Sequence, residues 1–193
     1  MGLADPSRSI LVAVDFQGRL MDLVYRHETL VDDVARAFRL ADLFAVPIVV
    51  TEQYPKGLGP TVPALQDVLD DLETPVRTIE KTTFSCCGEP TFLAALDELR
   101  GSPERQVIVI GIEAQICVVQ TVLELLDRGD SVLVCSEAVT GRGPEARHWA
   151  LERMRQAGAQ VLSLESIAFE WTRSKNHEAF KSVSGLFKGV ELP

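Results

Sequence analysis

Short apolar runs alternate along the chain with longer segments in which apolar positions recur every three or four residues. The short runs have the length of buried strands, and the longer segments have the period of amphipathic helices. The predicted strands cover residues 10–14, 47–50, 75–79, 106–110, 131–135 and 159–164. The predicted helices cover residues 29–44, 61–72, 90–99, 116–128, 144–157 and about 175–187.

This alternation predicts an α/β domain with a mainly parallel sheet and helices on both faces. The run QVIVI at 106–110 is the most apolar and is expected at the centre of the sheet, whereas the more polar run PVRTI at 75–79 is expected at an edge. Flavodoxin-like and Rossmann-like strand orders both fit the pattern. In either order ligands bind beyond the carboxyl ends of the strands, so the residues that follow strands are the candidates for function.

Composition and charge limit the classes of partner. The chain has 193 residues, which suits one domain, and its 46% hydrophobic and 24% charged residues are typical of a globular protein. With 19 Lys and Arg against 28 Asp and Glu, the net charge is −9, and we expect no binding to nucleic acids or anionic membranes. No apolar stretch approaches the ~18 residues of a membrane span, and the N-terminus shows no secretory signal.

Cysteine and histidine usage indicates neither disulfides nor a metal site. Four cysteines are too few for a disulfide framework in a chain of this size, so we expect reduced thiols and a cytoplasmic location. His27, His148 and His177 lie in separate segments without the spacing of metal ligands. The segment after the first strand reads VDFQGRL, and the chain holds neither G-x-G-x-x-G there nor a G-x-x-x-x-G-K-[ST] motif. We therefore predict no cofactor and no metal.

Three residues of complementary chemistry follow predicted strands: Asp15, Lys81 and Cys117. Cys117 lies where a helix should begin, and the positive end of a helix dipole lowers the pKa of a thiol. The ammonium of Lys81 would lower this pKa further, and Asp15 could exchange a proton with the thiol and with a leaving group. A buried inert thiol, a loop-capping carboxylate and a solvated amine are the ordinary structural alternatives, and spacing alone leaves both interpretations open.

Several motifs resemble the isochorismatase-like cysteine hydrolase superfamily, which includes nicotinamidases and N-carbamoylsarcosine amidohydrolases. The matching segments are VDFQ at 14–17, EKTTFS at 80–85 and GIEAQICV at 111–118 with Thr121. They stand in the family's order and at about its spacing. Each segment alone is a weak signal, whereas their combination is specific.

A further segment, VVTEQYPKGLG at 49–59, is similar to the uncharacterised isochorismatase-domain branch that includes MAR1-like proteins. The resemblance implies a Rossmann-like, three-layer α/β/α domain with a six-stranded, mostly parallel sheet. We expect this isochorismatase-like hydrolase domain to span residues 1–193. Its catalytic part is expected at about 10–164 and a C-terminal helical segment at about 165–193.

The resemblance also implies roles for individual residues. By position, Asp15 matches the family's acid/base, Lys81 its charge-stabilising lysine and Cys117 its nucleophile. The family carries a cis peptide bond that corresponds here to Ile112–Glu113. The backbone N–H groups of Glu113 and Cys117 would then form an oxyanion hole.

Two departures from the family narrow the expected reaction. The segment 51–59 holds no His and no Asp, so the metal cluster of nicotinamidases is not expected. Isochorismatases proper lack the cysteine nucleophile, so Cys117 disfavours hydrolysis of isochorismate. The sequence therefore predicts a metal-independent cysteine hydrolase of a small amide or a related C–N substrate, acting through a thioester.

Substrate contacts are predicted from strand-end side chains. Phe16, Gln17, Tyr54 and Phe84 are expected to bind a small-molecule substrate. A homo-oligomer is also expected, because such assemblies are common in the family. Neither the net charge nor the scattered histidines support a ribonuclease.

Two other functions remain as alternatives. The chain could be a catalytically silent scaffold that docks a protein through aromatic residues of its C-terminal segment, namely Phe169, Trp171, Phe180 and Phe187. A flavodoxin-like nucleotide binder is the weaker alternative, because no phosphate-binding motif is present.

Overall fold

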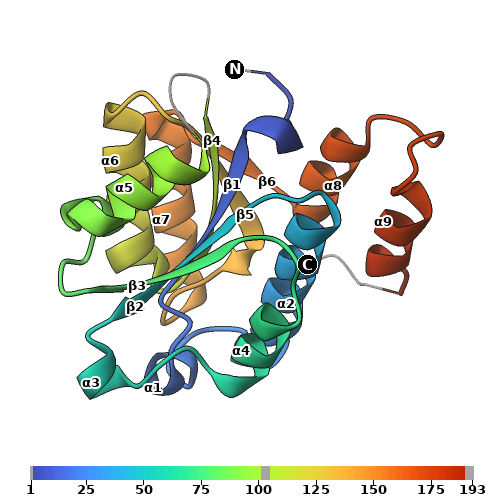
Figure 1. Cartoon of the computed structure of the whole chain (residues 1–193). Helices are drawn as coiled ribbons and strands as arrows, with labels where there is room; N and C mark the ends of the chain where they lie inside the picture. The colour runs from blue at the N-terminus through green and yellow to red at the C-terminus, as the bar shows by residue number, and fades with distance from the viewer. Residues whose placement is uncertain (1, 101–104, 190–193) are drawn as a thin grey trace.

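The computed structural model describes residues 2–100 and 105–189 and has a six-stranded sheet at its centre. All pairings between neighbouring strands of the sheet are parallel. The strand order is β3-β2-β1-β4-β5-β6 (Figure 1), which is the Rossmann order and not the flavodoxin-like one. The strands are β1 (Ser9–Val14), β2 (Ile48–Gln53), β3 (Val76–Lys81), β4 (Gln106–Gly111), β5 (Ser131–Val139) and β6 (Gln160–Leu162).

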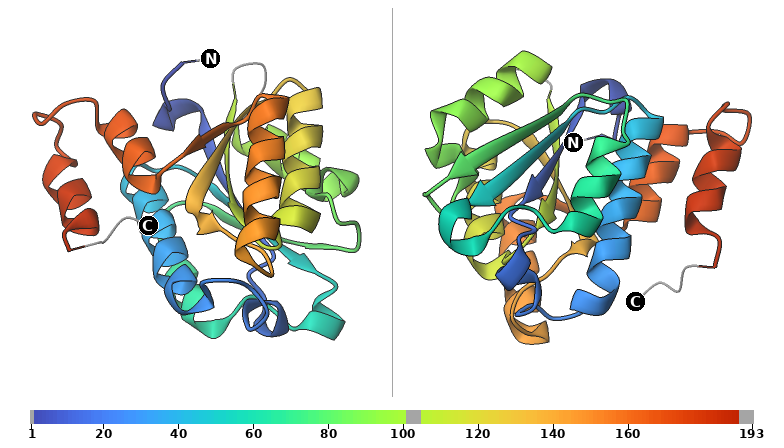
Figure 2. Two further views of the ribbon diagram at one scale, coloured as in Figure 1. Left: turned by 180° about the vertical axis from the view of Figure 1, so that it is seen from behind. Right: turned by 60° about the horizontal axis from the view of Figure 1, so that its bottom comes forward.

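Helices cover both faces of the sheet, as the sequence predicts (Figures 1 and 2). Helices α5, α6 and α7 lie on one face, while α2, α4 and α8 lie on the other, with α9 outside α8. The α-helices are α1 (Gly18–Met21), α2 (His27–Leu43), α3 (Pro55–Leu58), α4 (Pro63–Asp70), α5 (Pro90–Leu99), α6 (Val119–Asp127), α7 (Pro144–Ala157), α8 (Leu164–Thr172) and α9 (Phe180–Phe187). Shorter turns are η1 (Pro6–Arg8), η2 (Cys86–Gly88) and the π-helical η3 (Ala114–Val118).

Burial on both faces explains the uninterrupted apolar runs of the central strands. In β1, Ile10, Val12 and Val14 belong to the core under α5, α6 and α7, whereas Leu11 and Ala13 belong to the core under α2. All of these side chains are almost completely buried. Since side chains alternate across a strand, only a strand covered on both sides is apolar throughout. The edge strand β3 is more polar, as predicted.

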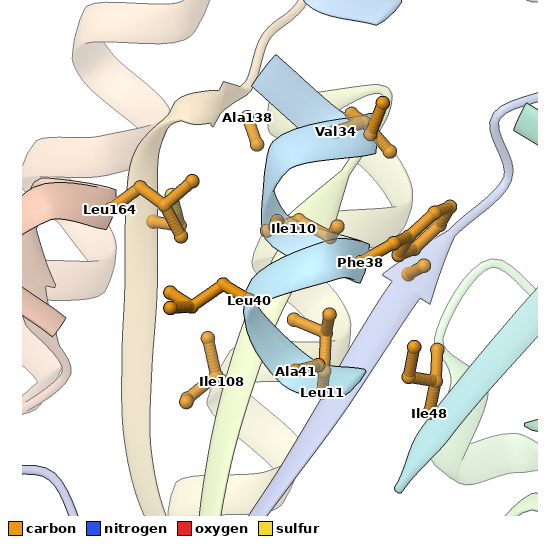
Figure 3. Packing of buried hydrophobic residues seen from close by; sticks show 14 of the residues in the cluster. Leu11, Val34, Phe38, Leu40, Ala41, Ile48, Ile108, Ile110, Ala138 and Leu164 are labelled. Atoms are coloured by element: carbon orange, nitrogen blue, oxygen red, sulfur yellow. The ribbon is translucent and has the colours of Figure 1, made fainter. Parts of the chain in front are cut away.

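Helix α2 closes one of the two cores (Figure 3). Its apolar positions Val34, Phe38 and Ala41 recur at helical spacing and are fully buried. They face Leu11 of β1 and Ile110 of β4 across the layer boundary. The apolar positions that recur at helical spacing in the sequence of α2 are therefore the positions that are buried in the structure.

Two predicted elements differ from the structure near the site. The helix expected at 116–128 is a π-helical turn, Ala114–Val118, followed by the shorter helix α6. The strand expected at 159–164 ends at Leu162, and helix α8 begins at Leu164, within the expected C-terminal helical segment but before the helix predicted at about 175–187. Polar contacts start this helix, because the Ser163 hydroxyl accepts the N–H of Ser166 and the Glu137 carboxylate accepts the N–H of Leu164.

The C-terminal aromatic side chains mostly cover their own domain. Trp171 is 4% exposed and packs on Phe44, and Phe180 and Phe187 are half-buried. Only Phe169 is largely exposed among them. These positions give little support to the expected docking surface. Residues 190–193 of the predicted C-terminal segment lie outside the described residues.

Within residues 2–100 and 105–189, no helix combines the length and the apolar character needed to cross a membrane. The four cysteines are all free thiols.

Candidate active site

Four neighbouring strands end at one edge of the sheet. Val14, the last residue of β1, lies between Thr51 of β2 and Gly111 of β4. On the far side of β2, Gln53 lies opposite Lys81, the last residue of β3. The register therefore places the residues that follow β1 beside the ends of β2, β3 and β4. This edge is where the catalytic residues predicted from the sequence are found.

Asp15 leaves β1 in a left-handed backbone conformation, with a φ of 58°. Its N–H donates to the carbonyl of Thr51 at 3.1 Å, and its own carbonyl accepts the N–H of Gln17 at 2.7 Å. The hydroxyl of Thr51 donates to Asp15 Oδ1 at 2.8 Å. Non-glycine residues adopt this conformation rarely and keep it where surrounding contacts enforce it, which is common at functional sites.

The Lys81 ammonium is buried in a cage of oxygen atoms. Its Nζ lies 2.7 Å from Asp15 Oδ2, and both side chains are 0% exposed. It also donates to Gln53 Oε1 at 2.6 Å and to the carbonyls of Phe84 at 3.1 Å and Thr83 at 3.2 Å. A buried charge requires such partners, and the oxygen atoms around the Lys81 ammonium supply them.

Cys117 is held in the π-helical turn between β4 and α6. The N–H of Val118 donates to the carbonyl of Glu113 at 3.3 Å. Donor and acceptor are five residues apart in the chain, which is the separation of a π-turn. Single π-turns recur at functional sites. The Cys117 side chain is almost buried and lies close enough to the carboxyl group of Asp15 for each to shift the pKa of the other. The structure therefore brings Asp15, Lys81 and Cys117 together.

The acidity of Cys117 differs from the sequence-based expectation. Burial, with Asp15 as the second cause, raises the pKa of the thiol to about 12, and the opposing charge of Lys81 is too weak to reverse this. The prediction of a lowered pKa is therefore wrong, because it counted the helix dipole and the ammonium but not the loss of solvent. Burial also raises the pKa of Asp15 against the effect of Lys81.

The end of β4 depends on a glycine. Gly111 has a φ of 153°, and a Cβ at this position would lie 2.5 Å from Val14 Cβ and 2.8 Å from the Val14 carbonyl oxygen. Only glycine allows β4 to approach the residue before Asp15 so closely.

The segment after Gly111 has the expected shape. The Ile112–Glu113 peptide bond is cis. Among the residues that the structure describes, the N–H of Glu113 meets no hydrogen-bond acceptor. The Glu113 carboxylate is paired with Arg142, with Nε–Oε1 at 2.6 Å and Nη2–Oε2 at 3.2 Å. This pair joins the segment beside Cys117 to the segment after β5.

The predicted substrate residues divide into two groups. Phe16 is 0% exposed and belongs to the hydrophobic core, so its expected place in a pocket wall is wrong. Gln17 is also buried, and its carboxamide bonds to the backbone of Gln53 and Gly59 at 2.6–3.0 Å. No polar atom of Gln17 is left for a substrate, and the residue instead ties down the segment after β2.

Tyr54 and Phe84, by contrast, are 55% and 56% exposed. A cavity of about 350 Å³ lies next to the Lys81 backbone, lined by Tyr54, Pro55, Lys56, Glu80, Lys81, Thr82 and Glu89. A slightly larger cavity of about 380 Å³, which includes Arg105 and Asp130, lies at the amino ends of β4 and β5 and is remote from the thiol. The first cavity is the better candidate for a substrate pocket, because it adjoins the predicted catalytic lysine.

Three polar residues of the site have no role in the sequence-based prediction, although Thr121 is part of the motif that resembles the family. Thr51 and Gln53 bind Asp15 and Lys81, and Thr121 links Cys117 to Cys86 through its hydroxyl. Thr51 and Gln53 lie in a segment already suspected because it ends a strand. Their partners follow from strand register, which the sequence pattern does not contain.

In the described part of the chain, no group of three His, Cys, Asp or Glu side chains is placed to hold a metal ion.

Comparison with known proteins gives consistent results. The sequence-family model of the isochorismatase domain matches residues 9–166 of this chain. Isochorismatase domain-containing protein 2 of Bos taurus is 38% identical over 189 residues, covering 97% of this chain and 87% of the bovine protein.

Among solved structures, the MAR1 ribonuclease of Caenorhabditis elegans has a TM-score of 0.88 and 33% identity, covering 100% of this chain and 99% of that one. The YcaC gene product of Escherichia coli, described as an octameric hydrolase of unknown specificity, has a TM-score of 0.86 and 26% identity, covering 97% and 90%. With a domain match across most of its length and these similarities, the chain belongs to the isochorismatase family, in its MAR1-like branch.

Proposed function

We propose that this protein is a metal-independent cysteine hydrolase that cleaves a small amide or a related C–N bond through a thioester on Cys117. Membership of the isochorismatase family supports a hydrolase-type function. The observation that carries the finer proposal is the contact of Cys117 and Lys81 with one carboxyl group, that of Asp15. An acid/base, a cation and a nucleophile in contact are the components of acyl transfer.

In the acylation half, the Asp15 carboxylate accepts the thiol proton while the sulfur of Cys117 attacks the carbonyl carbon. Since the pKa of the thiol is raised to about 12, the proton leaves during the attack and not before it. The unoccupied N–H of Glu113 and the N–H of Cys117 stabilise the negative oxygen. Protonated Asp15 then gives its proton to the leaving nitrogen, the C–N bond breaks, and a thioester remains.

In the deacylation half, Asp15 accepts a proton from water, and the resulting hydroxide attacks the thioester carbonyl. The C–S bond breaks, the acid is released, and the sulfur takes the proton back from Asp15. The Lys81 ammonium, 2.7 Å from Asp15, stabilises the carboxylate in each charged state. The proposed cycle needs only these three side chains, the substrate and one water molecule, and it returns each side chain to its starting protonation state.

The surroundings support a small-molecule substrate. Tyr54 and Phe84 expose aromatic surface on the segments that follow β2 and β3. We extend the oligomeric state named for the Escherichia coli protein to this chain only as a homo-oligomer of unspecified number. The ribonuclease name of the nematode protein is not extended, because a net charge of −9 repels a phosphate backbone.

Mass spectrometry of the protein incubated with small amides and carbamoyl compounds tests the proposal. We expect a covalent acyl adduct on Cys117 and release of the amine. Cys117→Ala should lose both, while Cys87→Ala, which removes a half-buried thiol outside the site, should keep both. Turnover by the Cys117→Ala variant would overturn the thioester mechanism, and so would the absence of adduct and turnover across the panel.

A further inference from the structure

Gln53 is a polar residue of the site that the proposed chemistry does not use. It is the last residue of β2 and lies directly opposite Lys81 in the register of β3. Its carboxamide oxygen accepts a hydrogen bond from the Lys81 ammonium at 2.6 Å, slightly shorter than the 2.7 Å between that ammonium and Asp15. The side chain is half-buried.

Hydrogen bonds hold both the carboxamide and the backbone of Gln53. Its Nε2 donates to the carbonyl of Thr82 at 2.9 Å, so the oxygen is the atom that faces Lys81. A flipped amide would direct N–H groups at the ammonium. The backbone of Gln53 is held by Gln17, which accepts the Gln53 N–H at 2.6 Å and donates to its carbonyl at 3.0 Å.

The neutrality of the Gln53 side chain matters more than the hydrogen bond that it accepts from Lys81. The other oxygens around the ammonium are one carboxylate, Asp15, and the carbonyls of Thr83 and Phe84. The titratable groups that sense Lys81 are Asp15 after β1, Cys86 in η2, Glu89 before α5 and Cys117 in η3. A neutral ligand at position 53 holds the ammonium without cancelling its positive field at the sulfur and at Asp15.

We infer that Gln53 is a positioning residue of the proposed active site, which fixes the Lys81 ammonium against Asp15 while leaving its charge available to Cys117. This inference rests on the proposed function. Gln53 does not take part in bond making, and it acts only through Lys81.

The test is the rate at which iodoacetamide alkylates Cys117 between pH 7 and pH 10, followed by mass spectrometry. Gln53→Glu keeps the shape but adds a carboxylate beside Lys81. We expect the alkylation rate at a given pH to fall about tenfold, which corresponds to a displacement of the rate profile by about one pH unit. Gln53→Met keeps the length without an acceptor, and we expect a fall of about threefold through lost positioning.

Gln66→Glu is the matched control, because it makes the same charge change on α4, outside the site. We expect its alkylation profile to match the wild type. Superimposable profiles for Gln53→Glu and the wild type, with folding confirmed by thermal unfolding, would overturn the inference. So would a fall in thermal stability without a displaced profile in both Gln53 variants, since this marks a merely structural residue. Neither result touches the adduct test of the proposed function, so the two failures are distinguishable.

Discussion

At the scale of the residue, the state of one proton decides how this site works. The thiol of Cys117 lies beside the Asp15 carboxyl, and burial raises the pKa of both groups. A thiol of this kind does not store a thiolate at neutral pH. Its reactivity depends on a base that removes the proton when an electrophile is present, and Asp15 is placed to do so.

The pH dependence of alkylation should show the absence of a stored thiolate, because iodoacetamide reacts only with the ionised sulfur. We expect the logarithm of the iodoacetamide rate at Cys117 to rise with a slope of about 1 from pH 7 to pH 10, without a plateau, because the pKa lies near 12. Rates are measured by peptide mass spectrometry after quenching. A plateau that begins below pH 7 would show a stored thiolate and contradict this account.

The sequence predicts which residues meet but not how each one behaves. Asp15, Lys81 and Cys117 were found because they follow or end strands, and parallel strands end at one edge. Phe16 and Gln17 follow the same strand and were assigned to the substrate on that basis. The left-handed turn at Asp15 instead directs them into the core and the loop backbone, and no apolar pattern encodes that turn.

At the scale of the element, one hydroxyl joins the segment after β3 to the helix after β4. Thr121 Oγ1 donates to the Cys117 carbonyl at 2.8 Å and accepts the N–H of Cys86 at 2.9 Å. Ser85 adds a second link by donating to Glu124 Oε2 at 2.8 Å. The segment that supplies the Lys81 carbonyl ligands is therefore tied to the turn that holds Cys117.

Replacement of Thr121 should separate the two functions of its side chain. Thr121→Val leaves the buried N–H of Cys86 without an acceptor, and we expect a loss of about 1–3 kcal/mol in the free energy of unfolding. Thr121→Ser keeps the hydroxyl and should lose about 1 kcal/mol. Urea denaturation measures both, and a larger loss for Thr121→Ser than for Thr121→Val would show that the methyl group matters more than the hydroxyl.

Apolar spacing predicts the helices and strands whose faces are uniformly buried. It does not predict an element boundary that a polar contact sets. The buried strands and the helices α2, α5 and α7 follow from apolar spacing. Helix α8 begins because Glu137, on a strand predicted to end at residue 135, reaches the N-terminus of this helix from β5. Such a contact between distant segments is not visible in local periodicity.

At the scale of the whole molecule, the C-terminal helices complete the layer beside α2. Trp171 of α8 packs on Phe44 at a ring distance of 5.4 Å, and Val183 of α9 is fully buried in the same core. The interaction scaffold inferred as an alternative from the C-terminal aromatic residues therefore loses most of its surface to the fold itself.

Truncation of two aromatic side chains in α8 should lower the free energy of unfolding by very different amounts. We expect Trp171→Ala to lower the free energy of unfolding by about 3–5 kcal/mol, because it empties a buried site. Phe169→Ala, at a side chain that is 39% exposed, should cost about 1 kcal/mol or less. Chemical denaturation compares the two, and a small loss for Trp171→Ala would indicate that α8 and α9 are not part of the core.

The register that places Gly111 beside Val14 has a consequence for synthesis of the chain. Asp15 is encoded near the start of the message and Cys117 far downstream, and they lie together only when β4 is paired with β1. A nascent polypeptide still attached to the ribosome before that insertion carries the acid and the amine but has no assembled reaction centre. The three side chains can therefore meet only once β4 has paired with β1.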